Sequence, residues 1–139
     1  MAHSSFEALS SAAMDTTWIL AFGQDRTLVR LRSEVLRMAG YQVDETFTLI
    51  DASESAKSDR IDALVICHTV ANEERKKLIG AVRQTRRLMP IICICSYPYD
   101  TVPSSCVFVE NSPITLLDSV QMAIRMYKSP NASSIQLAG

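Results

Sequence analysis

Short apolar runs alternate with segments of helical periodicity along most of this 139-residue chain, and this alternation restricts its fold more than any other feature. The runs at 18–22, 61–67 and 91–95 are almost continuously apolar, as strands buried on both faces of a sheet usually are. The segments 41–47 and 106–110 have the composition of two further strands. Strands that alternate with helices predict a parallel sheet covered by helices on both faces.

The segments between these runs differ in how strongly they predict a helix. Segment 25–39 carries an apolar stripe, and Gly40 follows it at the place of a C-terminal cap. Segment 51–60 is polar and predicts at most a short helix. Segments 72–90 and 112–128 predict longer helices, the first ended by a proline. The stripes expected to face the sheet are Leu28, Leu31, Val35 and Met38 in the first helix and Leu78, Val82, Thr85 and Met89 in the third.

The connection between the fourth and fifth strands is unusually short for a parallel crossover. Only "SYPYDTVPSS" (96–105) separates them, and Pro98 and Pro103 prevent a regular helix there. A parallel crossover normally needs a dozen or more residues, including a helix. We therefore expect the fourth covering helix to be missing or reduced to a turn.

Composition and charge restrict the class of protein. With 47% hydrophobic residues the chain can form one domain, which we place at 17–128, with flexible tails at 1–16 and 129–139. A formal net charge of -1 does not suit a general nucleic-acid binder, so the basic side chains of the first and third helices are expected to be solvated. The apolar runs are too short to span a membrane, and no secretory leader is recognisable, so we expect a cytoplasmic protein with reduced cysteines.

Four segments together resemble one known family. "WILAFGQDRTLVRLRSEVLRMAGYQV", "IDALVIC", "MPIICICS" and "FVENSPITLLDSV" are similar, in order and spacing, to the receiver domains of bacterial response regulators. The resemblance covers residues 17–128. It implies a flavodoxin-like, doubly wound sheet of five parallel strands in the order 2-1-3-4-5. It also implies a role in two-component signal transduction through contact with a protein partner.

The residues that the family uses for phosphorylation are replaced in this chain. The resemblance places the acidic pair at Gly23 and Gln24, and the phospho-acceptor aspartate at Cys67, or at His68 if the register slips by one residue. The family's Thr or Ser falls on Cys95, and its lysine falls on Ser112, or on Glu110 if the strand ends are matched instead. Phosphoryl transfer needs a carboxylate acceptor, and Mg²⁺ prefers hard oxygen ligands. We therefore expect a degenerate receiver domain that is no enzyme, needs no cofactor and acts independently of phosphorylation.

Two alternatives remain open at this point. In the first, Cys67, Cys95 and His68 lie together where the third and fourth strands end, and act as a redox- or metal-responsive sensor. Against it, buried cysteines are usually inert, and a closed zinc site normally needs four ligands. In the second, the chain is an unrelated enzyme or small-ligand binder with the same fold, because fold does not determine function.

The last helix has more apolar surface than one contact with a sheet requires. Its side chains beyond the expected core stripe predict an interface, either with a partner protein or between two copies of the chain. The residues expected at this interface are Leu117, Met122, Met126 and Tyr127.

Overall fold

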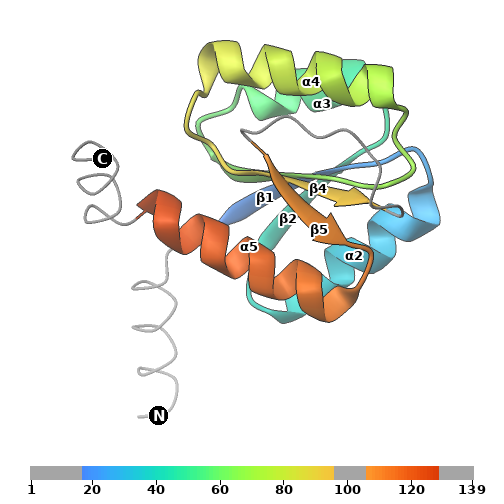
Figure 1. The fold of residues 1–139 in the computed structure, drawn as a ribbon, viewed down its shortest axis with the longest axis vertical. Coiled ribbons are helices and arrows are strands. Elements are labelled where there is room, and N and C mark those ends of the chain that lie inside the picture. Colours follow the sequence, from blue (N-terminus) through green and yellow to red (C-terminus); the bar gives the residue numbers. More distant parts are fainter. Residues whose placement is uncertain (1–16, 96–105, 129–139) are drawn as a thin grey trace.

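The computed structural model describes residues 17–95 and 106–128. The expectations for the two tails and for the connection at 96–105, including the reduced fourth helix, lie outside these residues. The elements, with the labels of Figure 1, are β1 (Trp18–Phe22), α2 (Arg26–Met38), β2 (Gln42–Thr46), α3 (Leu49–Ala56), β3 (Ile61–Ile66), α4 (Asn72–Thr85), β4 (Ile91–Cys95), β5 (Val107–Glu110) and α5 (Pro113–Lys128). None of the helices in these ranges has the length and hydropathy of a membrane span.

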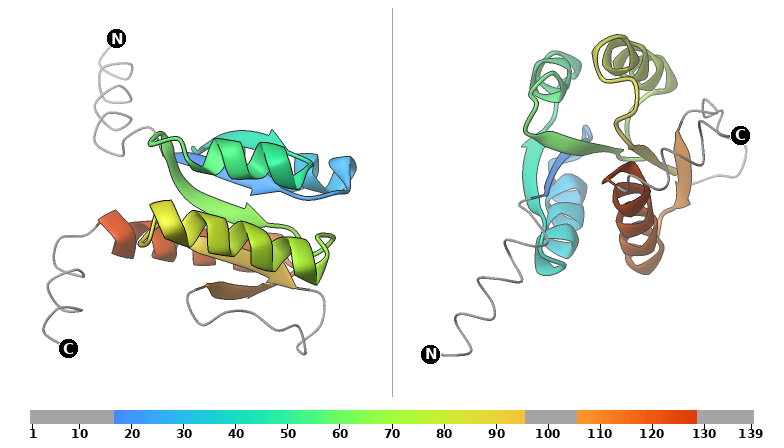
Figure 2. Two further views of the ribbon diagram at one scale, coloured as in Figure 1. Left: turned by 90° about the horizontal axis from the view of Figure 1, so that it is seen from above. Right: turned by 90° about the vertical axis from the view of Figure 1, so that its left-hand side faces the viewer.

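The five strands form one parallel sheet in the order β2-β1-β3-β4-β5, which confirms the predicted fold class and strand order. Helices α3 and α4 cover one face, and α2 and α5 cover the other (Figures 1 and 2). Each face has its own apolar core. We call them the α3/α4 core, which includes Leu64, Ile66 and Leu78, and the α2/α5 core, which includes Val65 and Val120.

Helix α2 begins and ends where its sequence predicts, but it buries a different face. Asp25 caps it, accepting a hydrogen bond from the Leu28 backbone N–H at 3.1 Å, and Gly40 follows it with a φ of 103°, which favours glycine. The side chains that face the core are Val29, Arg32, Ser33 and Leu36. The predicted stripe was therefore wrong: Leu31 is 57% exposed and Met38 is 86% exposed.

Helix α4 ends at Thr85, five residues before the proline that was expected to stop it. Arg86 leaves the helical conformation, and its guanidinium donates hydrogen bonds to the backbone carbonyls of Ser58 and Ile61 at 2.6 and 2.7 Å. These bonds tie the end of α4 to the start of β3. Met89 is fully buried, as predicted, but from the loop that follows the helix.

Candidate functional site

The carboxyl edge of the sheet holds all the positions that the family resemblance selected. β1 leads into Gly23 and Gln24, β3 leads into Cys67 and His68, and β4 ends at Cys95. β5 ends at Glu110, an exposed residue, and Ser112 lies just before α5. In open α/β sheets, ligands usually bind at this edge.

Gly23 is a buried residue whose missing side chain is essential to the packing. A Cβ atom placed on it would lie 2.6 Å from Val29 Cγ2 and 2.9 Å from Cys67 Cβ. Non-bonded carbon atoms normally stay about 3.5–4.0 Å apart, so no side chain fits there without displacing its neighbours. Position 23, where the resemblance places the first residue of the acidic pair, therefore has no room for a side chain in this structure.

Gln24 points outward and connects two loops across the edge. Its backbone N–H donates to Thr69 Oγ1 at 3.3 Å, and its side-chain Nε2 donates to Glu74 Oε1 at 3.0 Å. The amide therefore links the end of β1 to the first turn of α4.

Cys67 is completely buried and belongs to the α2/α5 core. Its backbone N–H donates to the Phe22 carbonyl at 2.8 Å, which holds the ends of β1 and β3 together. Burial raises the pKa of its thiol to about 11; the positive charge of Arg32 opposes this shift and the negative charge of Asp25 adds to it. At neutral pH the side chain is thus an uncharged thiol packed in a core, and it is the thiolate that would act as a nucleophile.

Cys95 lies on the opposite face of the sheet from Cys67, so the expectation that the two would lie together was wrong. The register pairs Ile66 with Cys93, and all three residues Ile66, Cys93 and Cys95 face the α3/α4 core. Cys67 follows Ile66 by one residue, and successive side chains on a strand point to opposite faces. The two thiols therefore cannot form the predicted sensor pair in this structure.

The neighbours of Cys95 are the other residues of the α3/α4 core. Arg75 Nη1 lies 3.9 Å from its sulfur atom, and this arginine is only 3% exposed. A hydrogen bond with Cys106, followed by burial, raises the pKa of Cys93. Within 17–95 and 106–128 no cysteine forms a disulfide, and no three His, Cys, Asp or Glu side chains are grouped to hold a metal ion.

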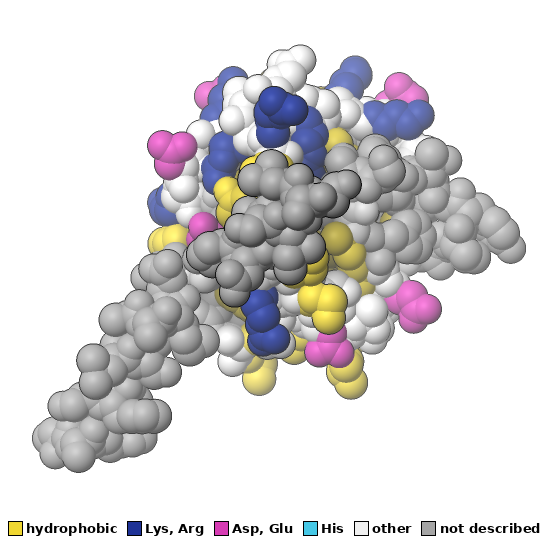
Figure 3. All heavy atoms as spheres, turned by 60° about the vertical axis from the view of Figure 1, so that its left-hand side comes forward, with side chains coloured by type: hydrophobic (Ala, Val, Ile, Leu, Met, Phe, Trp, Pro, Cys, Tyr) yellow, Lys and Arg dark blue, Asp and Glu magenta, His cyan; other side chains and the backbone are white. Residues whose placement is uncertain are grey.

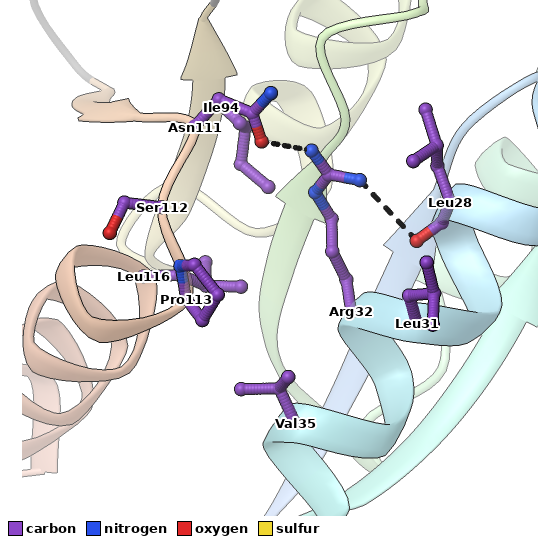
Figure 4. Close-up of a pocket in the computed structure, with 9 residues that line it drawn as sticks. All are labelled: Leu28, Leu31, Arg32, Val35, Ile94, Asn111, Ser112, Pro113 and Leu116. Atoms are coloured by element: carbon purple, nitrogen blue, oxygen red, sulfur yellow. Dashed lines mark hydrogen bonds between the residues drawn. The ribbon is translucent and has the colours of Figure 1, made fainter.

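Arg32 is a buried charged group at this edge, whereas the sequence predicts it among the solvated arginines of the first helix. It is 9% exposed. Its Nη2 donates to Asn111 Oδ1, and its Nη1 donates to the Leu28 carbonyl at 3.4 Å (Figure 4). The same Nη2 lies 3.1 Å from His68 Nδ1. Since a guanidinium only donates, Nδ1 of His68 accepts, and any proton on the neutral ring resides on Nε2.

The sequence positions of Arg32 and Asn111 could have indicated that both belong to this edge. Arg32 lies three and four residues from Val29 and Leu36, so it shares their face of the helix. Asn111 follows β5 directly, where side chains converge at the carboxyl edge. Ser112 lies beside it, and its carbonyl accepts the Leu116 N–H at 2.9 Å as α5 begins.

Comparison with known proteins supports the fold. No protein-family model and no curated protein sequence matches the chain. Among solved structures, a response regulator receiver protein from Sinorhizobium medicae has a TM-score of 0.70 at 19% identity, covering 83% of this chain and 99% of that one. Chemotaxis protein CheY4 from Vibrio cholerae has a TM-score of 0.67 at 20% identity, covering 78% and 99%.

A third similar structure was solved with its metal bound. The receiver domain of a sensor histidine kinase from Pseudomonas aeruginosa, with a magnesium ion coordinated in its active-site cleft, has a TM-score of 0.66 at 18% identity and covers 79% of this chain and 98% of its own. The described part of this chain therefore has the fold of response regulator receiver domains.

Proposed function

We propose that this chain is a receiver-fold signalling protein that binds a protein partner without being phosphorylated. The observation that carries the proposal is the packing at the end of β1 and β3. A buried thiol, Cys67, occupies the place expected for the acceptor, and it fills the space beside Gly23 where an acidic side chain would stand.

The electrostatics of the edge support the same proposal. Phosphoryl transfer in this family is expected to use carboxylates to hold Mg²⁺ close to the acceptor. Here the charge buried next to Cys67 is the guanidinium of Arg32, which would repel a divalent cation. Asp25 is committed to capping α2, and Glu74 accepts a hydrogen bond from Gln24.

The surface proposed for partner binding lies on α5. Met122 is 64% exposed and Met126 is 53% exposed, while Leu117 and Tyr127 are half-buried on other sides of the same helix. Figure 3 shows Lys and Arg side chains gathered over the upper helical layer, whereas hydrophobic side chains reach the surface lower down. Exposed methionines adapt to partners of varied shape, which suits a binding surface.

Treatment with a small-molecule phosphodonor tests this proposal. We expect acetyl phosphate with Mg²⁺ to leave both the intact mass and the sedimentation coefficient of the protein unchanged, because no carboxylate occupies the acceptor position. A conventional receiver domain treated in parallel is the positive control. A gain of one phosphoryl group on this protein, mapped by peptide sequencing to the carboxyl edge, would refute the proposal.

A further inference from the structure

A groove lies between α2 and the start of α5, next to the carboxyl edge, and the proposed partner binding makes no use of it. Its volume is about 200 Å³. Apolar side chains form its walls and floor: Leu28, Leu31 and Val35 from α2, Ile94 from β4, and Pro113 and Leu116 from α5. Leu28, Leu31 and Val35 belong to the stripe that the sequence predicted to face the core.

One end of this groove is cationic. The guanidinium of Arg32 extends along the groove to the loop before α5, where Asn111 and Ser112 complete the lining (Figure 4). Its side-chain contacts are neutral: the amide oxygen of Asn111 and the ring nitrogen of His68, together with the Leu28 carbonyl. No ion pair to a carboxylate is formed by Arg32 within the described ranges.

A buried positive charge with only neutral partners is costly unless an anion is near. A carboxylate accepts charge-assisted hydrogen bonds from a guanidinium that are roughly twice as strong as neutral ones, and it can accept two in parallel. Asn111 is exposed on its loop, so its amide oxygen can give way to a stronger acceptor. The charge therefore selects an anionic group at this end of the groove.

The walls select the rest of the ligand. An enclosed apolar cavity of roughly 150 Å³ is enough to bind benzene, so the groove has room for one ring or a short branched chain. We propose that this groove binds a small organic acid, with its carboxylate on Arg32 and its apolar body between α2 and α5. The site is separate from the proposed partner surface on α5, and either proposal can fail without the other.

Titrations followed by NMR test this inference on the whole protein. The probes are benzoate and phenylacetate, and their neutral controls are benzamide and phenylacetamide. We expect at least one acid to cause saturable shifts of the backbone amides of Leu31, Arg32, Val35 and Leu116, with an affinity at least about tenfold above that of its amide. The amide of Met122 serves as an internal control, because it is exposed outside the groove.

Two variants test the two halves of the groove. Arg32→Gln removes the charge and is expected to weaken acid binding at least about tenfold. Val35→Phe fills the apolar part while leaving the guanidinium in place, so it keeps the test valid if Arg32→Gln does not fold. The inference is overturned if neither acid gives saturable shifts at the groove, if the amides bind as tightly as the acids, or if a folded Val35→Phe variant binds like the unmodified protein.

Discussion

Gly23→Asp, which introduces an acidic residue at the end of β1, is expected to destabilise the protein by about 3 kcal/mol or more. The new Cβ would lie 2.6 Å from Val29 Cγ2 and 2.9 Å from Cys67 Cβ, so the core must shift to admit it. The carboxylate would also be attached to a buried residue, and burying its charge costs free energy. Urea unfolding followed by circular dichroism measures the change in the free energy of unfolding.

Neighbouring variants separate the steric cause from the charge. Gln24→Asp adds the same carboxylate one residue later on an exposed position and should cost less than about 1 kcal/mol. Gly23→Ala adds only the Cβ and should cost about 1–3 kcal/mol. The double variant Gly23→Ala/Val29→Ala should be less unstable than the sum of its single changes, because the contact at 2.6 Å disappears. Equal losses for Gly23→Asp and Gln24→Asp would contradict this account.

Cys67→Asp, which introduces a carboxylate where the proposed function places the replaced acceptor, is expected to cost about 3 kcal/mol or more at neutral pH. Cys67 is 0% exposed among apolar side chains, so the introduced charge would lose its water. The guanidinium of Arg32 offsets part of this penalty, as it does for the thiol. Even when folded, this variant is expected not to accept a phosphoryl group, because position 23 stays closed.

The pH dependence of Cys67→Asp identifies the cause of its loss of stability. Burial raises the pKa of the introduced carboxyl in the folded state above the unfolded value of about 3.9. The variant is therefore most stable below the unfolded-state pKa, where the carboxyl is uncharged in both states. This stability is lost as the pH rises through the folded-state pKa. Cys67→Ala, the matched control, should cost only about 1 kcal/mol and show no such slope between pH 4 and 7. A Cys67→Asp variant as stable at pH 7 as at pH 4 would show that the position is not desolvated.

The strands were predictable because the sequence carries their physical cause directly, whereas their order was implied only by the family resemblance. A run such as "IICIC" (91–95) is apolar at every position, which only a strand covered on both faces requires. Asp25 at the start of α2 and Gly40 after its end likewise indicate the helix boundaries locally. Each depends on a few adjacent residues and not on the rest of the fold.

The relation between Cys67 and Cys95 was missed because it depends on the register between two strands. The sequence indicates that both cysteines lie near strand ends at one edge. It does not state that Ile66 pairs with Cys93, and a shift of one residue moves every side chain to the other face. That pairing alone is enough to place Cys67 and Cys95 on opposite faces of the sheet.

Buried polar side chains were the other source of error. The Ser33 hydroxyl donates to the Val29 carbonyl at 2.8 Å, and Arg32 donates to acceptors in two loops. Because their polar groups have partners, both side chains can lie on the buried face of α2. Arg75 was expected on the solvated side of its helix but is buried against β4. Hydrophobic periodicity counts such residues as exposed, because their partners come from distant parts of the chain.

An NMR titration of the unmodified protein with Mg²⁺, followed by beryllofluoride, a stable mimic of a phosphoryl group, tests whether the carboxyl edge can still be activated. We expect no saturable shift of the backbone amides at 22–24, 67–69 and 110–112, because a buried thiol and a closed glycine position offer no oxygen ligands. Saturable shifts at these residues that extend into α5 would contradict this expectation, since they would show that the edge still binds the metal and responds to it.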